Sequence, residues 1–407
     1  MRRVRLFVFD DGRARRWAPF TLTRPAGEIL HGCLRLRERA ERVFGTPCEG
    51  HVTRRALLGY DEPGASPTVA LEGVGTRGTR VFVSSRAALE LEEVDAPGDE
   101  RRITVGGKPA GWVCPDGAPL PSETWLREPE AGPAKGDALE LAGALIGHPW
   151  DLVAANSERI RRDIETLWPD GDEPPGIVRL GEGAVSLGEG AEIEPGVYVD
   201  TRDGPVRLAE GARAEGPARL TGPLYVGAGT TVLGGHVGSS TLGPSCIVRG
   251  EVADSVFAGF INKAHDGYIG HALLGRWVNL GAFTTNSDLK NNYRPVSVWT
   301  PDGERDTGML KVGCFLGDHV KTGIGTVLNT GTVIGAGSNV YGGVMPPTVV
   351  PPFSWGSGPD LRDHQCDKFL QTAERAMARR GQELTPGVRR MLEEAWRATA
   401  GRRAEGR

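Results

Sequence analysis

The sequence predicts an α/β sheet domain, followed by a β-helix of hexapeptide repeats and a short helical tail. Three observations favour this class. Strand and helix patterns alternate before residue 170, an aliphatic residue recurs at every sixth position after residue 177, and glycine is in excess. The chain has 407 residues, enough for two or three domains at roughly 150 residues each. Its 59 glycines are about twice the ordinary share and lie most densely after residue 175, where tight turns must repeat.

The first 150 residues alternate between strand and helix patterns. Val4–Phe9 is an apolar run that ends at two aspartates and a glycine, and residues 79–85 form a second such run, so both predict buried strands. Apolar residues at helical spacing over residues 29–44 predict an amphipathic helix. A final helix is expected over residues 150–168. These elements predict a sheet with helices packed on it.

A turn-rich segment at residues 169–176, with three prolines and two glycines, marks the boundary between the domains. We expect an α/β domain over residues 1–170 and a β-helix over residues 177–358. A tail with helical patterning and an excess of basic residues is expected over residues 361–407.

The second half of the chain repeats with a period of six. Neither an amphipathic helix nor a simple hairpin strand keeps that period. A hexapeptide repeat does, because each six residues make one short strand and a turn, and three of them make one coil of a prism with an aliphatic core. The series are Leu187, Ile193 and Val199; Leu208, Ala214, Leu220, Val226 and Val232; Leu274 and Leu280; and Leu310, Leu316, Thr322, Leu328, Ile334 and Val340.

The six-residue register breaks once, between Asn286 and Leu310. That stretch has few core aliphatics and several turn residues, so it is expected to leave the prism as a loop. Loops on a rigid scaffold commonly carry function. We expect this loop to reach over a cleft between neighbouring prisms, with Lys290 or Arg294 facing an anionic ligand.

Composition restricts the partners and the compartment. Lys and Arg total 48 against 52 Asp and Glu, a net charge of −4 that predicts neither a nucleic-acid partner nor a membrane partner. The six cysteines include no CxxC pair, so neither a zinc knuckle nor a disulfide framework is indicated, and a reducing cytoplasm is expected. The sequence contains no apolar run of about 18 residues, so we expect no membrane anchor.

Polar residues gather on consecutive coils beside the expected loop. His265 lies two positions after Lys263, and Tyr268, Asn279 and Asn286 follow it. A prism has no deep pocket of its own, so such a group indicates a ligand site between neighbouring prisms. An imidazole there has the basicity needed to accept a proton from an attacking amine. The alternative is a solvated histidine in a turn, which is how His31, His51, His148 and His364 are interpreted.

The segment NKAHDGYIGHALLGRWVNLGAFTTNSDL, at residues 262–289, resembles the acetyltransferase half of the bifunctional N-acetylglucosamine-1-phosphate uridyltransferase/glucosamine-1-phosphate N-acetyltransferase family. The whole chain is more similar to a divergent two-domain branch of sugar nucleotidyltransferases, on Phe9-Asp10-Asp11 and the residues at 19–25, PFTLTRP. The resemblance implies a nucleotidyltransferase-like first domain and a left-handed β-helix. A homotrimer is expected because three prisms packed about a threefold axis create clefts that one prism lacks.

The resemblance also implies roles for residues of the prism. His265 matches the general base of the family, and Tyr268 and Asn279 match residues that hold the sugar and orient the acetyl group. Asn286 matches the first residue of an Asn-Tyr-Asp-Gly segment, which reads Asn-Ser-Asp-Leu in this chain. Lys290 matches a lysine of the family only with a shift of two positions. Lys263 is expected among the substrate-binding residues.

The N-terminal segment carries a second candidate site. Asp10 and Asp11 follow the first strand and Arg24 lies in the next loop, the place where open α/β sheets bind phosphates. An arginine suits a nucleotide phosphate and Asp11 suits Mg²⁺. The glycine-rich loop of sugar nucleotidyltransferases and its lysine are absent, so a domain that only binds nucleotide sugar stays open as an alternative.

These interpretations predict a cytoplasmic bifunctional enzyme. It would transfer the acetyl group of acetyl-CoA to an amino-sugar 1-phosphate, glucosamine 1-phosphate being expected, and a nucleotidyl group from UTP, with Mg²⁺, to give a nucleotide sugar. One alternative is a hexapeptide scaffold with an inactive first domain. Another is a zinc site of the carbonic-anhydrase kind, disfavoured because His265 and His271 are six positions apart and those enzymes use a spacing of five.

Overall fold

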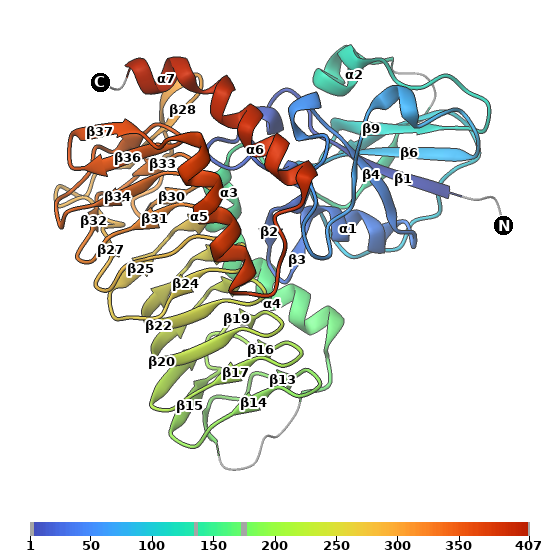
Figure 1. Cartoon of the computed structure of the whole chain (residues 1–407). Coiled ribbons are helices and arrows are strands. Elements are labelled where there is room, and N and C mark those ends of the chain that lie inside the picture. The colour runs from blue at the N-terminus through green and yellow to red at the C-terminus, as the bar shows by residue number, and fades with distance from the viewer. Residues whose placement is uncertain (1–3, 134–136, 172–176, 406–407) are drawn as a thin grey trace.

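The structure is a computed structural model that describes residues 4–133, 137–171 and 177–405. The boundary expected at residues 169–176 lies only partly in this range, since residues 172–176 lie outside the described residues. The predicted fold class is confirmed: a mixed α/β sheet comes first, a long stack of parallel strands follows, and helices end the chain (Figure 1). The left-handed winding of the stack stays a prediction.

The N-terminal part is built on a seven-stranded mixed sheet. Its strands, in spatial order, are β10 (Leu139–Leu141), β8 (Arg101–Val105), β9 (Lys108–Cys114), β6 (Thr79–Ser84), β1 (Val4–Phe9), β4 (Cys48–Val52) and β5 (Thr68–Val69). The strands β6, β1, β4 and β5 run parallel, and β9 is antiparallel to β6 and β8. Both strands predicted from apolar runs, β1 and β6, are therefore confirmed near the centre of the sheet.

The order of these strands defines where the sheet opens. From β1 the chain moves to β4 and β5 on one side, and it then returns to β6 on the other side of β1. Connections leave β1 and β6 in opposite directions, which makes their carboxyl ends a topological switch point, where open α/β sheets bind ligands. Asp10 and Asp11 follow β1 directly.

The helix predicted over residues 29–44 is only half correct. The helix α1 spans Leu36–Val43, whereas β2 (Leu30–His31) and β3 (Leu34–Arg35) form a small hairpin before it. Gly32 turns this hairpin with a φ of +67°, a conformation that glycine adopts without strain. The helix predicted over residues 150–168 is two helices, α3 (Pro149–Ala154) and α4 (Asn156–Leu167). The remaining elements of this part are α2 (Glu123–Arg127), β7 (Ala87–Leu89) and β11 (Gly143–Leu145).

Three faces of short parallel strands make the prism. One face holds β13 (Val185–Leu187), β16 (Val206–Leu208), β19 (Leu224–Val226), β21 (Thr241–Leu242), β23 (Val256–Phe257), β26 (Leu273–Leu274), β30 (Phe315–Leu316), β33 (Val333–Ile334) and β35 (Val349–Val350). A second holds β12 (Val178–Leu180), β15 (Val197–Asp200), β18 (Ala218–Thr221), the ends of β20 (Thr231–Gly238) and β22 (Ile247–Ala253), β25 (Tyr268–Gly270), β27 (Thr285–Asn286) and β32 (Val327–Leu328).

The third face holds β14 (Glu192–Ile193), β17 (Arg213–Ala214), the starts of β20 and β22, β24 (Asn262–Lys263), β31 (Lys321–Thr322), β34 (Asn339–Tyr341) and β36 (Ser354–Ser357). At its end, β37 (Asp360–Asp363) pairs antiparallel with β36. Asn279 bridges β24 and β31 on this face. One aliphatic cluster fills the interior.

The six-residue series lies in that interior with one exception. Leu208, Val226 and Ile334 are fully buried, and most other members of the series share their cluster. Leu310, by contrast, is 51% exposed, so the prediction that it opens the last series is wrong. The isolated bridge between Leu289 and Lys311 shows that Lys311 still belongs to the expelled loop. The chain returns to the prism only at the buried residues Cys314 and Phe315.

The expelled loop contains the hairpin β28 (Ser297–Thr300) and β29 (Gly303–Asp306). Val296 and Val298 are buried in a cluster with Trp17 and Phe20 of the N-terminal part. The loop is therefore confirmed as an excursion from the prism. Its hairpin, however, packs on the α/β part of the same chain, which differs from the expectation that it covers a cleft between prisms.

The C-terminal helices join the two parts. Figure 1 shows α5 (Cys366–Ala378) along the prism and α6 (Pro386–Ala398) between the prism and the α/β part, followed by α7 (Ala400–Glu405). Phe369 and Leu392 of these helices share a core with Leu57 and Trp277. Among the helices that the structure describes, none has the length and apolar character needed to span a bilayer.

Candidate functional site

A cavity of about 820 Å³ opens at the switch point of the sheet. Asp11 and Arg86, which follow β1 and β6, both line it. The other charged residues of the lining are Arg13, Arg16, Lys108, Arg127, Arg305, Glu128, Glu130 and Asp302. Cations outnumber acids in this lining, and the place matches the site where open α/β sheets bind phosphates. The cavity therefore suits a ligand that carries both phosphate and polar hydroxyl groups.

Asp11 organises the floor of this cavity. Its Oδ1 accepts the backbone N–H groups of Arg13 at 3.0 Å and Ala14 at 2.8 Å. Its Oδ2 accepts the Ser84 hydroxyl at 3.0 Å and the Arg86 Nε–H at 2.7 Å. Asp11 is only 1% exposed. Its carboxylate therefore fixes the loop that follows β1, and Arg86 neutralises its charge.

Neither aspartate fits Mg²⁺ as the sequence suggested. Asp10 accepts the backbone N–H of Ala26 at 3.1 Å and the Thr53 hydroxyl at 2.5 Å, and it is 2% exposed. Every carboxylate oxygen of Asp10 and Asp11 thus has a protein donor. Over the described ranges, no group of three or more His, Cys, Asp or Glu side chains is arranged to hold a metal ion.

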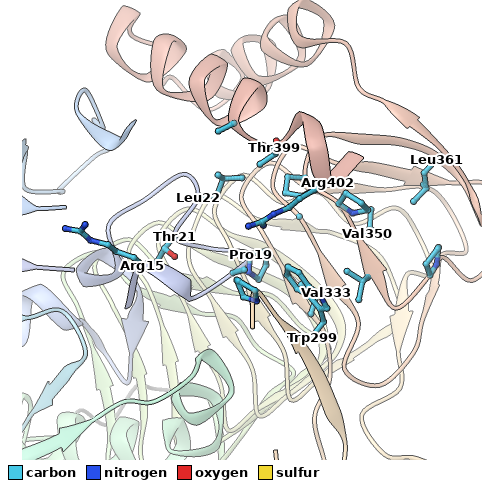
Figure 2. A pocket seen from close by; sticks show the side chains of 18 of the residues that line it. Arg15, Pro19, Thr21, Leu22, Trp299, Val333, Val350, Leu361, Thr399 and Arg402 are labelled. Carbon is cyan, nitrogen blue, oxygen red and sulfur yellow. The ribbon is translucent and has the colours of Figure 1, made fainter. Parts of the chain in front are cut away.

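A second cavity, of about 520 Å³, lies where the N-terminal part, the β28–β29 hairpin, the end of the prism and the last helices meet (Figure 2). Its lining includes Arg15, Arg54 and Arg402 and a wall of proline and valine side chains. The expelled loop contributes to both cavities, since Trp299 lines this one and Thr300 lines the first. No sequence pattern indicates this second cavity, because it forms from four distant segments.

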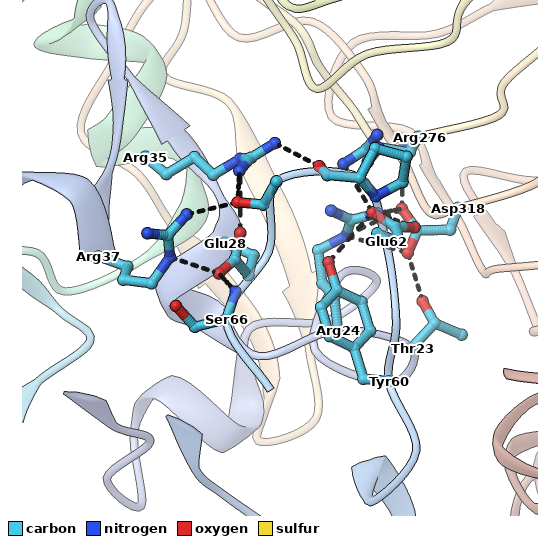
Figure 3. A network of polar contacts seen from close by, with 12 residues as sticks. Thr23, Arg24, Glu28, Arg35, Arg37, Tyr60, Glu62, Ser66, Arg276 and Asp318 are labelled. Atoms are coloured by element: carbon cyan, nitrogen blue, oxygen red, sulfur yellow. Dashed lines mark hydrogen bonds and ion pairs between the residues drawn. The ribbon is translucent and has the colours of Figure 1, made fainter. Parts of the chain in front are cut away.

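Arg24 does not face a nucleotide site, and that expectation is corrected. Its side chain is 1% exposed, and its Nη2 lies 2.9 Å from Asp318 Oδ1 and 3.4 Å from Glu62 Oε1 (Figure 3). Thr23 donates to the same Asp318 at 2.7 Å, and Arg276 lies 2.8 Å from Glu62. Asp318 follows the prism strand β30, so this network joins the two parts of the chain. The guanidinium of Arg24 is thus already paired with two protein carboxylates.

His265 lies at a corner of the prism, between β24 and β25, and its side chain is exposed. In the next coil, Phe283 donates its backbone N–H to the carbonyl of Asp266 at 2.9 Å, and this bond joins the two coils at the corner that carries His265. Phe283 is 63% exposed and Ile324, farther along the same edge, is 73% exposed. The predicted base therefore sits on an accessible, partly apolar edge of the prism.

Lys263 points into the prism and not toward a substrate. It takes the place that Val248 has in the preceding coil, and it is 2% exposed. Its Nζ donates to the carbonyl of Arg249 at 2.6 Å and to the carbonyl of His265 at 3.0 Å. Burial lowers the pKa of Lys263 to about 8. The predicted substrate contact is thus corrected: Lys263 anchors the turn that carries His265.

Asn286 is also an interior residue. It pairs with Leu328 of the next coil and is 3% exposed. Its amide accepts the N–H of Gly270 at 2.9 Å and donates to the carbonyl of Gly270 at 3.0 Å. The substrate-binding role expected for Asn286 is therefore not supported by its position, because both ends of its amide bind the neighbouring coil.

Tyr268, Asp288 and His271 form a cluster on the second face. The Tyr268 hydroxyl donates to Asp288 Oδ2 at 2.7 Å, and His271 Nδ1 lies 2.7 Å from the same oxygen. Burial opposes ionisation of Asp288, but the bonds from His271 and Tyr268 dominate and lower its pKa. Burial and Asp288 both raise the pKa of Tyr268. A carboxylate on Nδ1 leaves Nε2 of an imidazole as the proton acceptor.

Two predicted residues lie apart from this cluster. Asn279 is on the third face, where its side-chain oxygen accepts the Asn262 amide at 3.0 Å. It lines a groove of about 320 Å³ below the end of α5, together with Lys321. Lys290 donates to the carbonyl of Pro295 at 3.0 Å within the expelled loop. The structure therefore places the predicted prism residues on two faces and in the interior.

The His271–Asp288 pair was missed by the sequence analysis, which considered His271 only as a zinc ligand. A signal was available, because Tyr268 begins β25, His271 follows that strand, and Asp288 follows β27, which lies beside β25 in the next coil. In a hexapeptide prism, equivalent positions of successive coils lie side by side.

Comparison with known proteins supports the interpretation of the first domain. Residues 6–170 match the family model described as "Sugar nucleotidyl transferase". The chain is 27% identical over 202 residues to a bifunctional sugar-1-phosphate nucleotidylyltransferase/acetyltransferase of Sulfurisphaera tokodaii, covering 49% of this chain and 45% of that protein. It is 32% identical over 194 residues to the bifunctional protein GlmU of Methanococcus aeolicus, covering 47% and 42%.

A shorter match, 33% identical over 95 residues, is to the uncharacterized acetyltransferase YaiX of Escherichia coli O6:K15:H31, covering 23% of this chain and 32% of that one. A solved Arabidopsis UDP-N-acetylglucosamine acyltransferase matches 56% of this chain and 94% of its own at 15% identity, with a TM-score of 0.24, too low to carry an argument. The chain spans less than half the length of the two bifunctional relatives. Residues 6–170 are therefore a sugar nucleotidyl transferase domain, in a chain whose homologues include bifunctional sugar-1-phosphate nucleotidylyltransferase/acetyltransferases.

Proposed function

We propose that the chain is a bifunctional sugar-phosphate transferase. The prism transfers the acetyl group of acetyl-CoA to the amine of an amino-sugar 1-phosphate, with glucosamine 1-phosphate as the expected substrate. The α/β domain transfers a nucleotidyl group from UTP to a sugar 1-phosphate. The observation that carries the proposal is the match of residues 6–170, together with a cation-rich cavity at the switch point of that same domain.

Acetyl transfer requires three things of the prism. The amine must be held near the thioester carbonyl, must lose a proton, and must attack the carbonyl carbon while the thiolate of CoA leaves. We propose His265 as the group that takes this proton, because it is exposed at a corner held by Lys263. The Tyr268 hydroxyl and the Asn279 amide supply polar contacts on the two adjoining faces.

His271 is a second candidate for the same proton. Asp288 orients its ring through Nδ1, an arrangement that His265 lacks among the described residues. The Nε2 of His271 lies 3.7 Å from Asp254, so an approaching ammonium would meet a carboxylate beside the acceptor nitrogen. Both imidazoles therefore enter the test.

We propose a homotrimer with acetyl-transfer sites between subunits. The exposed side chains of Phe283 and Ile324 lie on the edge that carries His265, and burying such apolar surface favours association. A cleft between prisms would give acetyl-CoA the depth that one prism lacks. Sedimentation equilibrium should give about three times the chain mass of 43.4 kDa. A monomer with full activity would contradict the shared site.

The deciding experiment follows two products in one reaction. Purified protein is incubated with acetyl-CoA, glucosamine 1-phosphate and UTP, with and without magnesium, and free thiol and pyrophosphate are measured separately. Replacing the general base should lower thiol release by about 10² to 10⁴ without changing pyrophosphate release. His265→Ala and His271→Ala are compared with His236→Ala, an exposed histidine bonded to Thr221 two coils earlier.

Each outcome has one meaning. Loss of thiol release in His265→Ala alone assigns the base to His265, and loss in His271→Ala alone assigns it to His271. Thiol release that survives both substitutions contradicts the site. Wild-type protein that releases no thiol with any amino-sugar phosphate contradicts acetyl transfer.

A scaffold that only binds nucleotide sugar is the second candidate for the first domain. The observation that favours it is the full engagement of Asp10 and Asp11 by protein donors. The same experiment separates the two: UTP binding without pyrophosphate release supports the scaffold, and release supports the transferase.

A further inference from the structure

The cavity of about 520 Å³ at the junction of the two parts has an unusual charge pattern. Arg15, Arg54 and Arg402 line it, and the lining includes no acidic residue. They come from the loop after β1, the segment after β4 and the helix α7. Three segments far apart in the sequence thus contribute an arginine to one lining, and Figure 2 shows that the Arg15 guanidinium points away from Arg402 and the apolar wall.

None of these three arginines has a carboxylate within 4.0 Å in the described part of the chain. The Arg15 Nε–H donates to the backbone carbonyl of Asp10, at 2.9 Å. Arg15 and Arg54 are half-buried and Arg402 is exposed, whereas the buried Arg24 and Arg86 are each paired with an aspartate. A partly buried cation without a carboxylate partner beside an apolar cavity is a candidate anion ligand.

Arg54 is repelled by both of the other arginines. Burial lowers the pKa of Arg54, Asp10 opposes this, and Arg15 and Arg402 lower it further. Burial lowers the pKa of Arg15 as well. The repulsion of Arg54 is a cost that an anion beside Arg54 and Arg402 would reduce.

Apart from Thr21 and Thr399, the other side chains of the lining are apolar. Pro19 and Leu22 contribute one side, the prism contributes Val333 and Val350, and the indole of Trp299 closes another side. Figure 2 shows these side chains around one space beneath the C-terminal helices, where Thr399 joins α6 to α7 and α7 supplies Arg402. Arg402 lies 5.8 Å from the Trp299 ring centroid, so the cationic and apolar parts of the lining meet.

We propose that this cavity binds an organic phosphate whose body is apolar, with the phosphate beside Arg54 and Arg402 and the apolar body against Trp299, Val333 and Val350. The site is separate from the cavity at the switch point, whose lining mixes acids and cations. Guanidinium groups bind phosphate oxygens through paired hydrogen bonds, and the volume lies in the range of small-ligand pockets. The inference does not depend on the proposed transferase activities.

The test uses hexyl phosphate, inorganic phosphate and hexanol as probes, measured by calorimetry on the full chain. Hexyl phosphate should bind about tenfold or more tightly than inorganic phosphate, because its methylene groups leave water. Hexanol should not bind measurably. Arg54→Met and Arg402→Met should each weaken hexyl phosphate binding by about tenfold or more, as expected for loss of a charged hydrogen bond. Arg55→Met, an exposed neighbour paired with Glu72, is the matched control and should leave binding unchanged.

A second readout separates a ligand site from a structural cation. Arg54→Met should leave the melting temperature unchanged or raise it, because it removes an unpaired and repelled charge. A clear fall in melting temperature would show that Arg54 stabilises Asp10 and would overturn the proposal. Equal binding of hexyl phosphate by the wild type and both variants, or absence of saturable binding, would overturn it as well. Loss of acetyl transfer or of pyrophosphate release in the wild type would not affect it.

Discussion

Arg24→Met should remove about 3 kcal/mol from the free energy of unfolding, a magnitude that follows from its burial. The side chains of Arg24 and Asp318 are 1% and 3% exposed, so the substitution leaves a buried carboxylate without its main partner. Breaking such a pair costs about 3–5 kcal/mol. Asp318 keeps the Thr23 hydroxyl at 2.7 Å and the backbone N–H of Arg276 at 2.8 Å, which places the expected value at the lower end.

Urea unfolding, followed by tryptophan fluorescence, measures this loss. The surface variant Arg55→Met is the control, since Arg55 and Glu72 are 83% and 65% exposed and such pairs contribute about 0–1 kcal/mol. Asp318→Leu and the double variant Arg24→Met/Asp318→Leu complete a double-mutant cycle. The double variant should be more stable than the sum of the single changes implies, because it removes both charges together.

UTP binding tests the nucleotide-binding role that the sequence predicted for Arg24. UTP affinity should be unchanged in Arg24→Met, because the guanidinium binds protein carboxylates. A loss of stability no larger than that of Arg55→Met, or a coupling energy near zero, would refute the burial argument. A specific loss of UTP affinity at unchanged stability would restore the nucleotide-binding role.

Three other substitutions test separate regions. Burial lowers the pKa of His319 to about 3, so between pH about 6.5 and about 3 this histidine takes up a proton in the unfolded chain but not in the folded one. The free energy of unfolding should therefore fall as the pH falls through this range. In urea titrations at several pH values, His319→Phe should make this fall less steep. Asn156→Ala should cost about 1–3 kcal/mol in thermal unfolding, because it leaves the buried N–H of Gly32 without an acceptor. Lys263→Met should reduce thiol release at little cost in stability, since methionine suits the core but cannot hold the His265 carbonyl.

Each of these has a contrary outcome. An unchanged pH slope in His319→Phe would place the relevant proton elsewhere. An Asn156→Ala variant as stable as the wild type would mean that water replaces the amide. Full thiol release in Lys263→Met would show that the turn at His265 holds its shape without the ammonium group.

The prism was predictable because its signal is local and repeated. Leu208, Val226 and Ile334 belong to six-residue series, and every coil requires an aliphatic residue at the same place. Leu310 was wrongly predicted as the first core residue of the last series. An aliphatic residue can have the right spacing and still lie in a loop where the backbone has left the stack of coils. Spacing alone does not show where the chain re-enters.

The helix predicted over residues 29–44 failed for a related reason. Ile29, Leu30 and Cys33 are buried, as the apolar pattern requires, but they are buried through a hairpin and its turn at Gly32. A short hairpin and a helix can bury the same residues, and tertiary packing decides between them.

The candidate site was harder to predict, because a polar side chain in a prism can point either to the surface or into the interior. Lys263 and Asn286 looked like surface ligands, yet both occupy interior positions, where backbone carbonyls and amides satisfy them. Arg24 looked like a phosphate ligand, and its true partner, Asp318, lies 294 positions later. No local pattern in the sequence connects residues at that distance.

That separation of 294 positions has a consequence for synthesis of the chain. A ribosome adds about 5–20 residues per second, so Arg24 waits roughly 15–60 s for Asp318 to be made. During that interval, the N-terminal sheet can fold from its own strands, which end at Leu141, while the buried charges at its future joint stay in water. The joint should therefore form last, and a chain stalled before residue 318 should expose Arg24 and Glu62 to proteases that spare the finished protein.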